Sequence, residues 1–170
     1  RRYVDAVAGT SAHIWDTRKT TPGLRELEKY AVCQGGGKNH RGSLSQAVLI
    51  KDNHLAALDS RGIGLAAAVT QARRNAPPGT VIEVEVTDLD EARTAAEAGA
   101  DVILLDNMTP DEMREVVREL GGRVKLEASG GINLDTVRAV AQTGVDIISV
   151  GALTHSVPAL DISLDFQVTD

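Results

Sequence analysis

Short apolar runs alternate with amphipathic segments along almost the whole chain. The runs are brief, rich in Val, Ile and Leu, and bounded by Gly, Asp or Asn, which is typical of strands buried on both faces. We predict strands at 47–50, 81–86, 102–105, 124–126 and 145–150, with a weaker first strand at 12–15. These strands belong to a sheet that helices cover.

The segments between the strands have helical periodicity. Met113, Val116, Val117 and Leu120 recur at i, i+3, i+4 and i+7, so they share one helical face, and Thr109 precedes that face as an N-cap. Other helices are predicted at 24–32, 65–75, 89–98 and 133–140. The chain is therefore expected to contain about six β–α units with short connections.

Such regular alternation implies a parallel sheet with right-handed crossovers. A doubly wound sheet and a (β/α) barrel both fit the pattern. We favour the barrel, because polar groups recur at the C-terminal ends of nearly every strand, where barrel enzymes place their chemistry. We thus predict an α/β fold, an incomplete or modified (β/α) barrel of about six βα units, forming one catalytic domain over residues 1–170.

Composition and charge restrict the partners. The chain has 170 residues, of which 42% are hydrophobic and only 2% aromatic, so its core is aliphatic. The net charge of -6 argues against nucleic acid or an anionic membrane as a partner. Apolar stretches fall short of the roughly 20 residues that span a bilayer, and no signal peptide is visible, so we expect a cytoplasmic protein. The single cysteine, Cys33, excludes an intrachain disulfide.

Five basic or potentially basic residues follow the early strands: Arg18, Lys19, His40, Arg41 and Lys51. If the barrel closes, they meet at one mouth, where their repulsion costs stability unless an anion receives them. The planar fork of arginine suits a carboxylate, and lysine suits phosphate or carboxylate. Any one of these residues could instead be a surface cation paired with a nearby acid. The whole set favours a polyanionic, carboxylated ligand.

Acidic residues follow on the next strands. Glu83 and Glu85 lie on the same face of their strand, and a carboxylate inside a barrel is costly unless it meets a cation, a metal or hydroxyl groups. Together with Asp106, Glu85 could hold Mg²⁺ through water and bond the hydroxyls of a sugar. The alternative is an internal salt bridge to Lys51 or Lys125.

Two glycine turns follow the last strands. Ser129, Gly130 and Gly131 precede a predicted helix, and Gly151 follows the final strand. Backbone N–H groups at such positions bind phosphate, although glycines also serve simply to permit tight turns. Phosphoribosyl pyrophosphate together with an aromatic acid would occupy all of these places.

Several motifs, in the same order, resemble the quinolinate phosphoribosyltransferase family. They lie at 14–25, 35–41, 49–54, 126–132 and 150–156, and the resemblance covers essentially the whole chain as the family's C-terminal barrel domain. It implies phosphoribosyl transfer from phosphoribosyl pyrophosphate to quinolinate with decarboxylation. The products would be nicotinate mononucleotide, pyrophosphate and CO₂, in NAD biosynthesis, with Mg²⁺ as cofactor.

The resemblance also implies roles for individual residues. The two carboxylates of quinolinate would be received by Arg18, His40, Arg41 and Lys51, with Lys19 near the pyrophosphate. Glu85 and Asp106 would lie beside the ribose and its Mg²⁺, and they would share the catalytic role with Lys19 and Lys51. The 5-phosphate would be held by Ser129, Gly130, Gly131 and Gly151, with His155 nearby.

Two features depart from the family pattern. The family carries an additional N-terminal domain of roughly a hundred residues, which we expect this chain to lack. In the homodimer or higher oligomer of the full-length protein, that domain covers the partner's barrel mouth and adds an arginine. The second departure is Cys33-Gln34, where the family usually has Arg and a small or apolar residue.

Three other hypotheses remain. An aldolase-like barrel would use Lys51 or Lys125 as a Schiff-base nucleophile. A sister phosphoribosyltransferase would act on another pyridine or base. An inactive barrel fragment would merely bind phosphate. The pairing of Arg18 with Arg41 favours a dicarboxylate substrate.

Overall fold

The computed structural model describes residues 1–167, so the last three residues of the predicted domain lie outside the described part. Its strands form one six-stranded sheet in the order β1-β6-β5-β4-β3-β2, and every pairing is parallel. The strands are β1 (His13–Trp15), β2 (Ala47–Ile50), β3 (Val81–Val86), β4 (Val102–Asp106), β5 (Lys125–Ser129) and β6 (Ile147–Ser149). Each predicted strand is confirmed, with its ends moved by a few residues at most.

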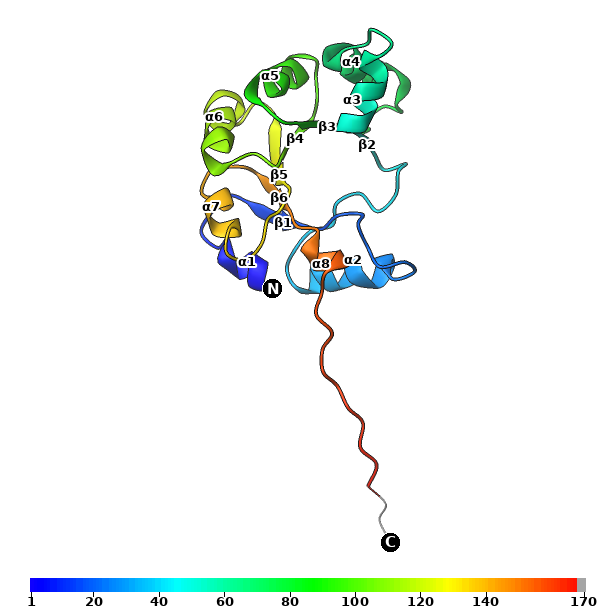
Figure 1. Cartoon of the computed structure of the whole chain (residues 1–170), viewed down its shortest axis with the longest axis vertical. Helices are drawn as coiled ribbons and strands as arrows, with labels where there is room; N and C mark the ends of the chain where they lie inside the picture. Colours follow the sequence, from blue (N-terminus) through cyan, green and yellow to red (C-terminus); the bar gives the residue numbers. More distant parts are fainter. Residues whose placement is uncertain (168–170) are drawn as a thin grey trace.

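The helices stand around the outside of a curved sheet (Figure 1). They are α1 (Arg2–Ala6), α2 (Arg25–Gln34), α3 (Asp52–Asp59), α4 (Leu65–Asn75), α5 (Leu89–Glu97), α6 (Pro110–Leu120), α7 (Val137–Ala141) and α8 (Ala152–His155). β1 and β2 are the two ends of the strand order, and the segment from α2 to β2 runs across the opening between them (Figure 1). The incomplete barrel is therefore confirmed, and the doubly wound alternative is wrong.

Strand alternation separates an apolar layer from a polar interior. Ile82, Val84 and Val86 of β3 are fully buried and belong to the aliphatic core that the helices cover. Glu83 and Glu85 alternate with them and point to the other face, the interior of the barrel. The same alternation on the neighbouring strands places further polar side chains inside the barrel.

Helix α6 shows how local sequence fixes an element. The Glu112 carboxylate accepts the N–H of Thr109 at 2.7 Å, and the Thr109 hydroxyl accepts the N–H of Glu112 at 3.4 Å. This capping box satisfies N–H groups that a helix start leaves free. Met113, Val116 and Leu120 are buried, which confirms the predicted face.

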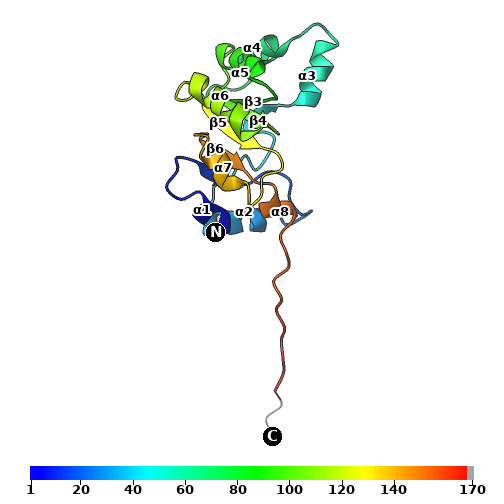
Figure 2. The ribbon, with the colours of Figure 1, turned by 60° about the vertical axis from the view of Figure 1, so that its left-hand side comes forward.

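Three short helices were not predicted: α1, α3 and α8. Helix α3 begins directly after β2, where the N–H of Lys51 donates to Nδ1 of His54 at 3.0 Å. Beyond α8 the chain extends away from the barrel (Figure 2), and it exposes the large apolar side chains Leu160, Ile162, Leu164 and Phe166. Within residues 1–167, no helix combines the length and the apolar character needed to cross a membrane.

Candidate active site

A cavity of about 800 Å³ opens at the C-terminal ends of the strands. Strand ends and the loops after them form most of its wall, as expected for a barrel, and the segment between α2 and β2 adds His40 and Arg41. Each candidate site residue of the sequence lines this one cavity: Arg18, Lys19, His40, Arg41, Lys51, Glu85, Asp106, Ser129, Gly130, Gly131, Gly151 and His155. Residues that are far apart in the chain are thus brought together.

Two arginines form a positive wall of the cavity. Nη1 of Arg41 donates to the carbonyl of Ala47 at 3.0 Å, while Nε of Arg18 is buried without a hydrogen-bond partner. Burial lowers the pKa of Arg41, and the positive charge of Arg18 lowers it further. In the described part of the chain, neither arginine has a carboxylate within salt-bridge distance. An anion between them would relieve this repulsion.

The carboxylates face this wall from β3 and β4. Glu85 is buried and accepts a hydrogen bond from Nζ of Lys51 at 2.6 Å, so the internal salt bridge considered for this residue is present. Asp106 accepts from the side-chain nitrogen of Asn107 at 2.6 Å. Lys125 lies at the start of β5, away from the cavity, and pairs with Asp146. Carboxylate oxygens of this kind suit a hard cation such as Mg²⁺.

Close packing requires glycine at the first turn and favours it at the second, where the His155 side chain would have to move. Gly130 has a φ of 94°, and a methyl group there would overlap the Asn107 side chain. At Gly151, the added carbon would lie 2.6 Å from Nε2 of His155. Glycine therefore lets the backbone itself form the cavity wall at these turns, and a bound phosphate needs such direct access to N–H groups.

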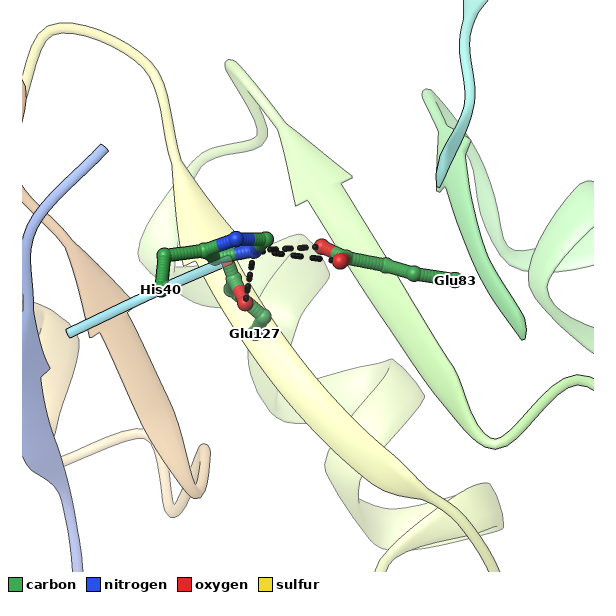
Figure 3. A group of neighbouring side chains, drawn as sticks. All are labelled: His40, Glu83 and Glu127. Atoms are coloured by element: carbon green, nitrogen blue, oxygen red, sulfur yellow. Dashed lines mark hydrogen bonds and ion pairs between the residues drawn. The ribbon is translucent and has the colours of Figure 1, made fainter. Parts of the chain in front are cut away.

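An interior cluster joins His40 to two glutamates (Figure 3). Nε2 of His40 lies 3.0 Å from Glu83 Oε2 and 3.6 Å from Glu127 Oε2. The Ser149 hydroxyl donates to Glu127 Oε1 at 2.5 Å. Burial raises the pKa of Glu127 to about 8, and the negative charge of Glu83 adds to the rise. Burial works to lower the pKa of His40, but the hydrogen bond to Glu83 and the nearby charges outweigh it and raise that pKa above 6.5.

Comparison with known proteins identifies the family to which this site belongs. Residues 1–165 match the family model described as quinolinate phosphoribosyl transferase, C-terminal domain. The chain belongs to this family.

Relatives within the quinolinate phosphoribosyl transferase family share both sequence and fold. A probable nicotinate-nucleotide pyrophosphorylase (carboxylating) of Bacillus subtilis is 50% identical over 100% of this chain and 57% of its own length. The Mycobacterium leprae enzyme of the same name is 48% identical over 96% of this chain and 57% of its own. The nicotinate-nucleotide pyrophosphorylase structure from Francisella tularensis superposes with a TM-score of 0.88 at 44% identity, over 95% of this chain and 56% of that one. This chain therefore spans a little over half the length of these relatives.

Sequence reasoning about the family motifs missed the residues that hold the loop of His40 and Arg41. Asp16 is fully buried, and its Oδ1 accepts from Nζ of Lys29 at 2.6 Å and from the N–H of His40 at 2.8 Å. Lys29 also donates to the carbonyl of His40 at 3.0 Å. Asp16 stands directly after β1, so its position signalled importance, but its partner on α2 could only be found in three dimensions.

Proposed function

We propose that this chain is the catalytic barrel of a quinolinate phosphoribosyltransferase. The reaction transfers a phosphoribosyl group to the nitrogen of quinolinate and removes one carboxylate, giving nicotinate mononucleotide, pyrophosphate and CO₂ for NAD biosynthesis. The observation that carries this proposal is the pair Arg18 and Arg41. Both line a cavity that also holds carboxylates and glycine turns, and in the described part of the chain neither has a carboxylate within salt-bridge distance. Adjacent carboxylates on a pyridine ring provide the charge that this pair lacks.

The quinolinate end of the cavity acts by orientation. Arg18 and Arg41 each offer a planar set of donors to one carboxylate, and Lys51 adds a point charge. Holding both carboxylates fixes the ring in its plane and directs the ring nitrogen towards the sugar. Such positioning converts an encounter of two molecules into a step within one complex.

The phosphoribosyl end acts mainly by electrostatics. Positive charge develops on the anomeric carbon as pyrophosphate leaves, so Glu85 and Asp106 stabilise it while Lys19 faces the leaving group. Mg²⁺, held by Glu85 and Asp106 through water, would supply additional positive charge for the pyrophosphate. The turns at Ser129–Gly131 and Gly151 hold the 5-phosphate, with His155 beside them.

Decarboxylation follows from the product of the first step. Once the nitrogen carries the ribosyl group, the ring is cationic. The bond between C2 and its carboxylate then breaks, CO₂ leaves, the electron pair stays on C2, and C2 takes up a proton. No covalent bond to the protein is needed.

The surroundings of the site are proposed from the family. The full-length protein would work in the cytoplasm as a homodimer or higher oligomer. An N-terminal domain of one subunit would then bring another arginine to the quinolinate end of its partner. The acceptor would remain quinolinate rather than another pyridine, because Arg18 and Arg41 call for two carboxylates.

Pyrophosphate release from phosphoribosyl pyrophosphate and Mg²⁺ tests this proposal. We expect release that depends on quinolinate and is absent with nicotinate, by this chain or by the extended protein that contains it. Arg41→Ala should lower kcat/KM for quinolinate by about 100-fold, since each lost charged hydrogen bond costs on the order of 1.5–3 kcal/mol. Arg74→Ala, which removes an exposed arginine from α4, is the matched control.

Other outcomes would identify the competing functions. Equal turnover of nicotinate would indicate a sister phosphoribosyltransferase, and an adduct on Lys51 after borohydride trapping would indicate a Schiff-base enzyme. If neither this chain nor the extended protein released pyrophosphate with quinolinate, the proposed reaction would be wrong.

A further inference from the structure

Glu127 has one carboxylate oxygen with a partner and one without. Its Oε1 accepts from the Ser149 hydroxyl at 2.5 Å, whereas Oε2 is buried and makes no hydrogen bond to any of residues 1–167. The residue is 1% exposed and lies in the cavity wall, with its carboxylate beside the same ring nitrogen of His40 that Glu83 contacts (Figure 3). A buried, unpartnered carboxylate oxygen is costly, so it requires an explanation.

The hydrogen bonds of His40 show which of its two ring nitrogens carries a proton. Nδ1 lies 2.8 Å from the N–H of Arg41, and it can accept this bond only through a lone pair. The ring therefore carries its proton on Nε2, which is directed to Glu83. Glu127 obtains no full hydrogen bond from the ring, because its Oε2 is 3.6 Å from Nε2.

Two ionised glutamates cannot share this interior cheaply. Ligand atoms of His40, Glu83 and Glu127 lie within 4.8 Å of one another, and all three residues are largely enclosed. The groups that face the cluster are Arg41 from the loop, Glu83 from β3 and Ser149 from β6, while Lys51 is already paired with Glu85. A proton on Glu127 Oε2 removes the repulsion and gives that oxygen a hydrogen to donate towards Glu83.

We propose that Glu127 is a positioning residue that acts in its neutral, protonated form. Ser149 and Glu83 hold the Glu127 side chain, Glu83 accepts from both Glu127 and His40, and His40 in turn fixes the backbone of Arg41. The raised pKa of Glu127, about 8, agrees with this arrangement. The consequence for catalysis rests on the proposed function, but the arrangement itself does not.

The position of the interior cluster explains how it could affect ligand binding. The segment that carries His40 and Arg41 crosses the opening between β1 and β2, where no strand pairing holds it continuously (Figure 1). The interior cluster ties that segment to β3, β5 and β6. Loosening the cluster should therefore misplace the Arg41 guanidinium and weaken binding of the dicarboxylate, with a smaller effect on the chemical step.

The test compares Glu127→Gln with Glu127→Ala. A glutamine amide can accept from Ser149 and donate to Glu83, as the protonated acid does, but alanine can do neither. We expect Glu127→Ala to raise KM for quinolinate by about 10-fold or more, as for other residues that orient a ligand group. Glu127→Gln should restore most of this loss. A retained melting temperature for both variants would show that the fold is intact.

Two measurements need no substrate, so they remain decisive if the proposed reaction fails. Trp15 is the single tryptophan of the chain, and its ring meets that of His40 edge-on with centroids 5.7 Å apart. Its emission should be unchanged in Glu127→Gln and shifted in Glu127→Ala. With ¹³C-labelled glutamate, the carboxyl resonance that disappears in Glu127→Gln should show the protonated chemical shift at pH 6 in the unsubstituted chain.

Three results would overturn the proposal. Trp15 emission could change in Glu127→Gln as much as in Glu127→Ala. The Glu127 resonance could titrate near pH 4.5, the usual value for a glutamate. The chain could also contain a stoichiometric divalent ion that both variants lose, which would make the cluster a metal site.

Discussion

At the scale of single residues, the cavity wall is built from charges that the fold neutralises only in part. Lys51 has Glu85 at 2.6 Å, but within residues 1–167 neither Arg18 nor Arg41 has a carboxylate within salt-bridge distance. Lysine in an ion pair and arginine without one behave differently towards a ligand. An incoming carboxylate gains the full attraction of the arginines, whereas at Lys51 it competes with Glu85.

If Glu127 is protonated in the folded state, the free energy of unfolding should depend on pH. The folded state holds this proton up to a pH of about 8, whereas an unfolded glutamate loses it near 4.5. Between these values the folded state binds more protons, so the free energy of unfolding should fall as pH rises. Glu127→Gln removes this contribution.

Urea unfolding at several pH values between about 4.5 and 8 measures this effect. The curve for Glu127→Gln should be flatter than that of the unsubstituted chain. Because glutamine mimics the protonated acid, the two curves should lie closest at the low end of the range and diverge most at the high end. Parallel curves would mean that Glu127 is ionised in the folded state throughout.

What the sequence revealed at this scale depended on position after a strand. Arg18 and Asp106 could be selected because each lies at or just after the end of a strand, and both line the cavity. Arg41 lines it too, but it follows helix α2 and precedes β2, so the expectation that it follows a strand was wrong. Glu127 could not be recognised in the same way, because it lies between Leu126 and Ala128 within β5. Its significance comes from His40 and Ser149, which are distant in sequence and meet it only across the barrel.

At the scale of elements, the glycine turn between β5 and α7 invites a matched pair of substitutions. Gly130 and Gly99 have φ values of 94° and 90°, so alanine is strained to a similar degree at both, by about 1 kcal/mol. Only at Gly130 would the new methyl group meet a neighbour, the Asn107 side chain. Gly130→Ala should therefore lose more stability and bind phosphoribosyl pyrophosphate at least about 10-fold more weakly.

Calorimetric titration with phosphoribosyl pyrophosphate, together with thermal melts, separates the two effects. Gly99→Ala should melt at a lower temperature and keep its affinity. Equal affinities for the two variants would exclude the β5–α7 turn from the phosphate site.

Helix α3 shows why some elements escaped prediction. The segment Lys51–His54 carries polar side chains and follows a strand, and its sequence shows no helical periodicity, so no helix was predicted there. It is instead the first turn of a helix, which the His54 ring helps to begin by accepting the N–H of Lys51. This contact between one side chain and the backbone stabilises the start of the helix. A search for hydrophobic periodicity cannot detect such a contact.

At the scale of the whole molecule, the alternation of strands and helices in the sequence implied the order of the strands. It did not imply the opening between β1 and β2. Parallel βα units pack side by side in chain order, which accounts for the run from β2 to β6. β1 joins β6 and not β2, so the sheet stays open on one side. What holds that side is a set of buried contacts between distant residues, such as Asp16 with Lys29. No local pattern in the sequence encodes such contacts.

Because the sheet is open between β1 and β2, amide hydrogen exchange should differ between the middle of the sheet and the segment that crosses the opening. β4 and β5 each have a neighbour on both sides and lie furthest from the ends of the sheet, so their amides should exchange slowest. The segment 38–46 should exchange much faster. Quinolinate bound between Arg18, after β1, and Arg41, ahead of β2, would link the two sides of the opening. It should therefore slow exchange in 38–46 and leave β4 unchanged. Arg41→Ala should abolish that protection, and protection that persisted in this variant would place the dicarboxylate elsewhere.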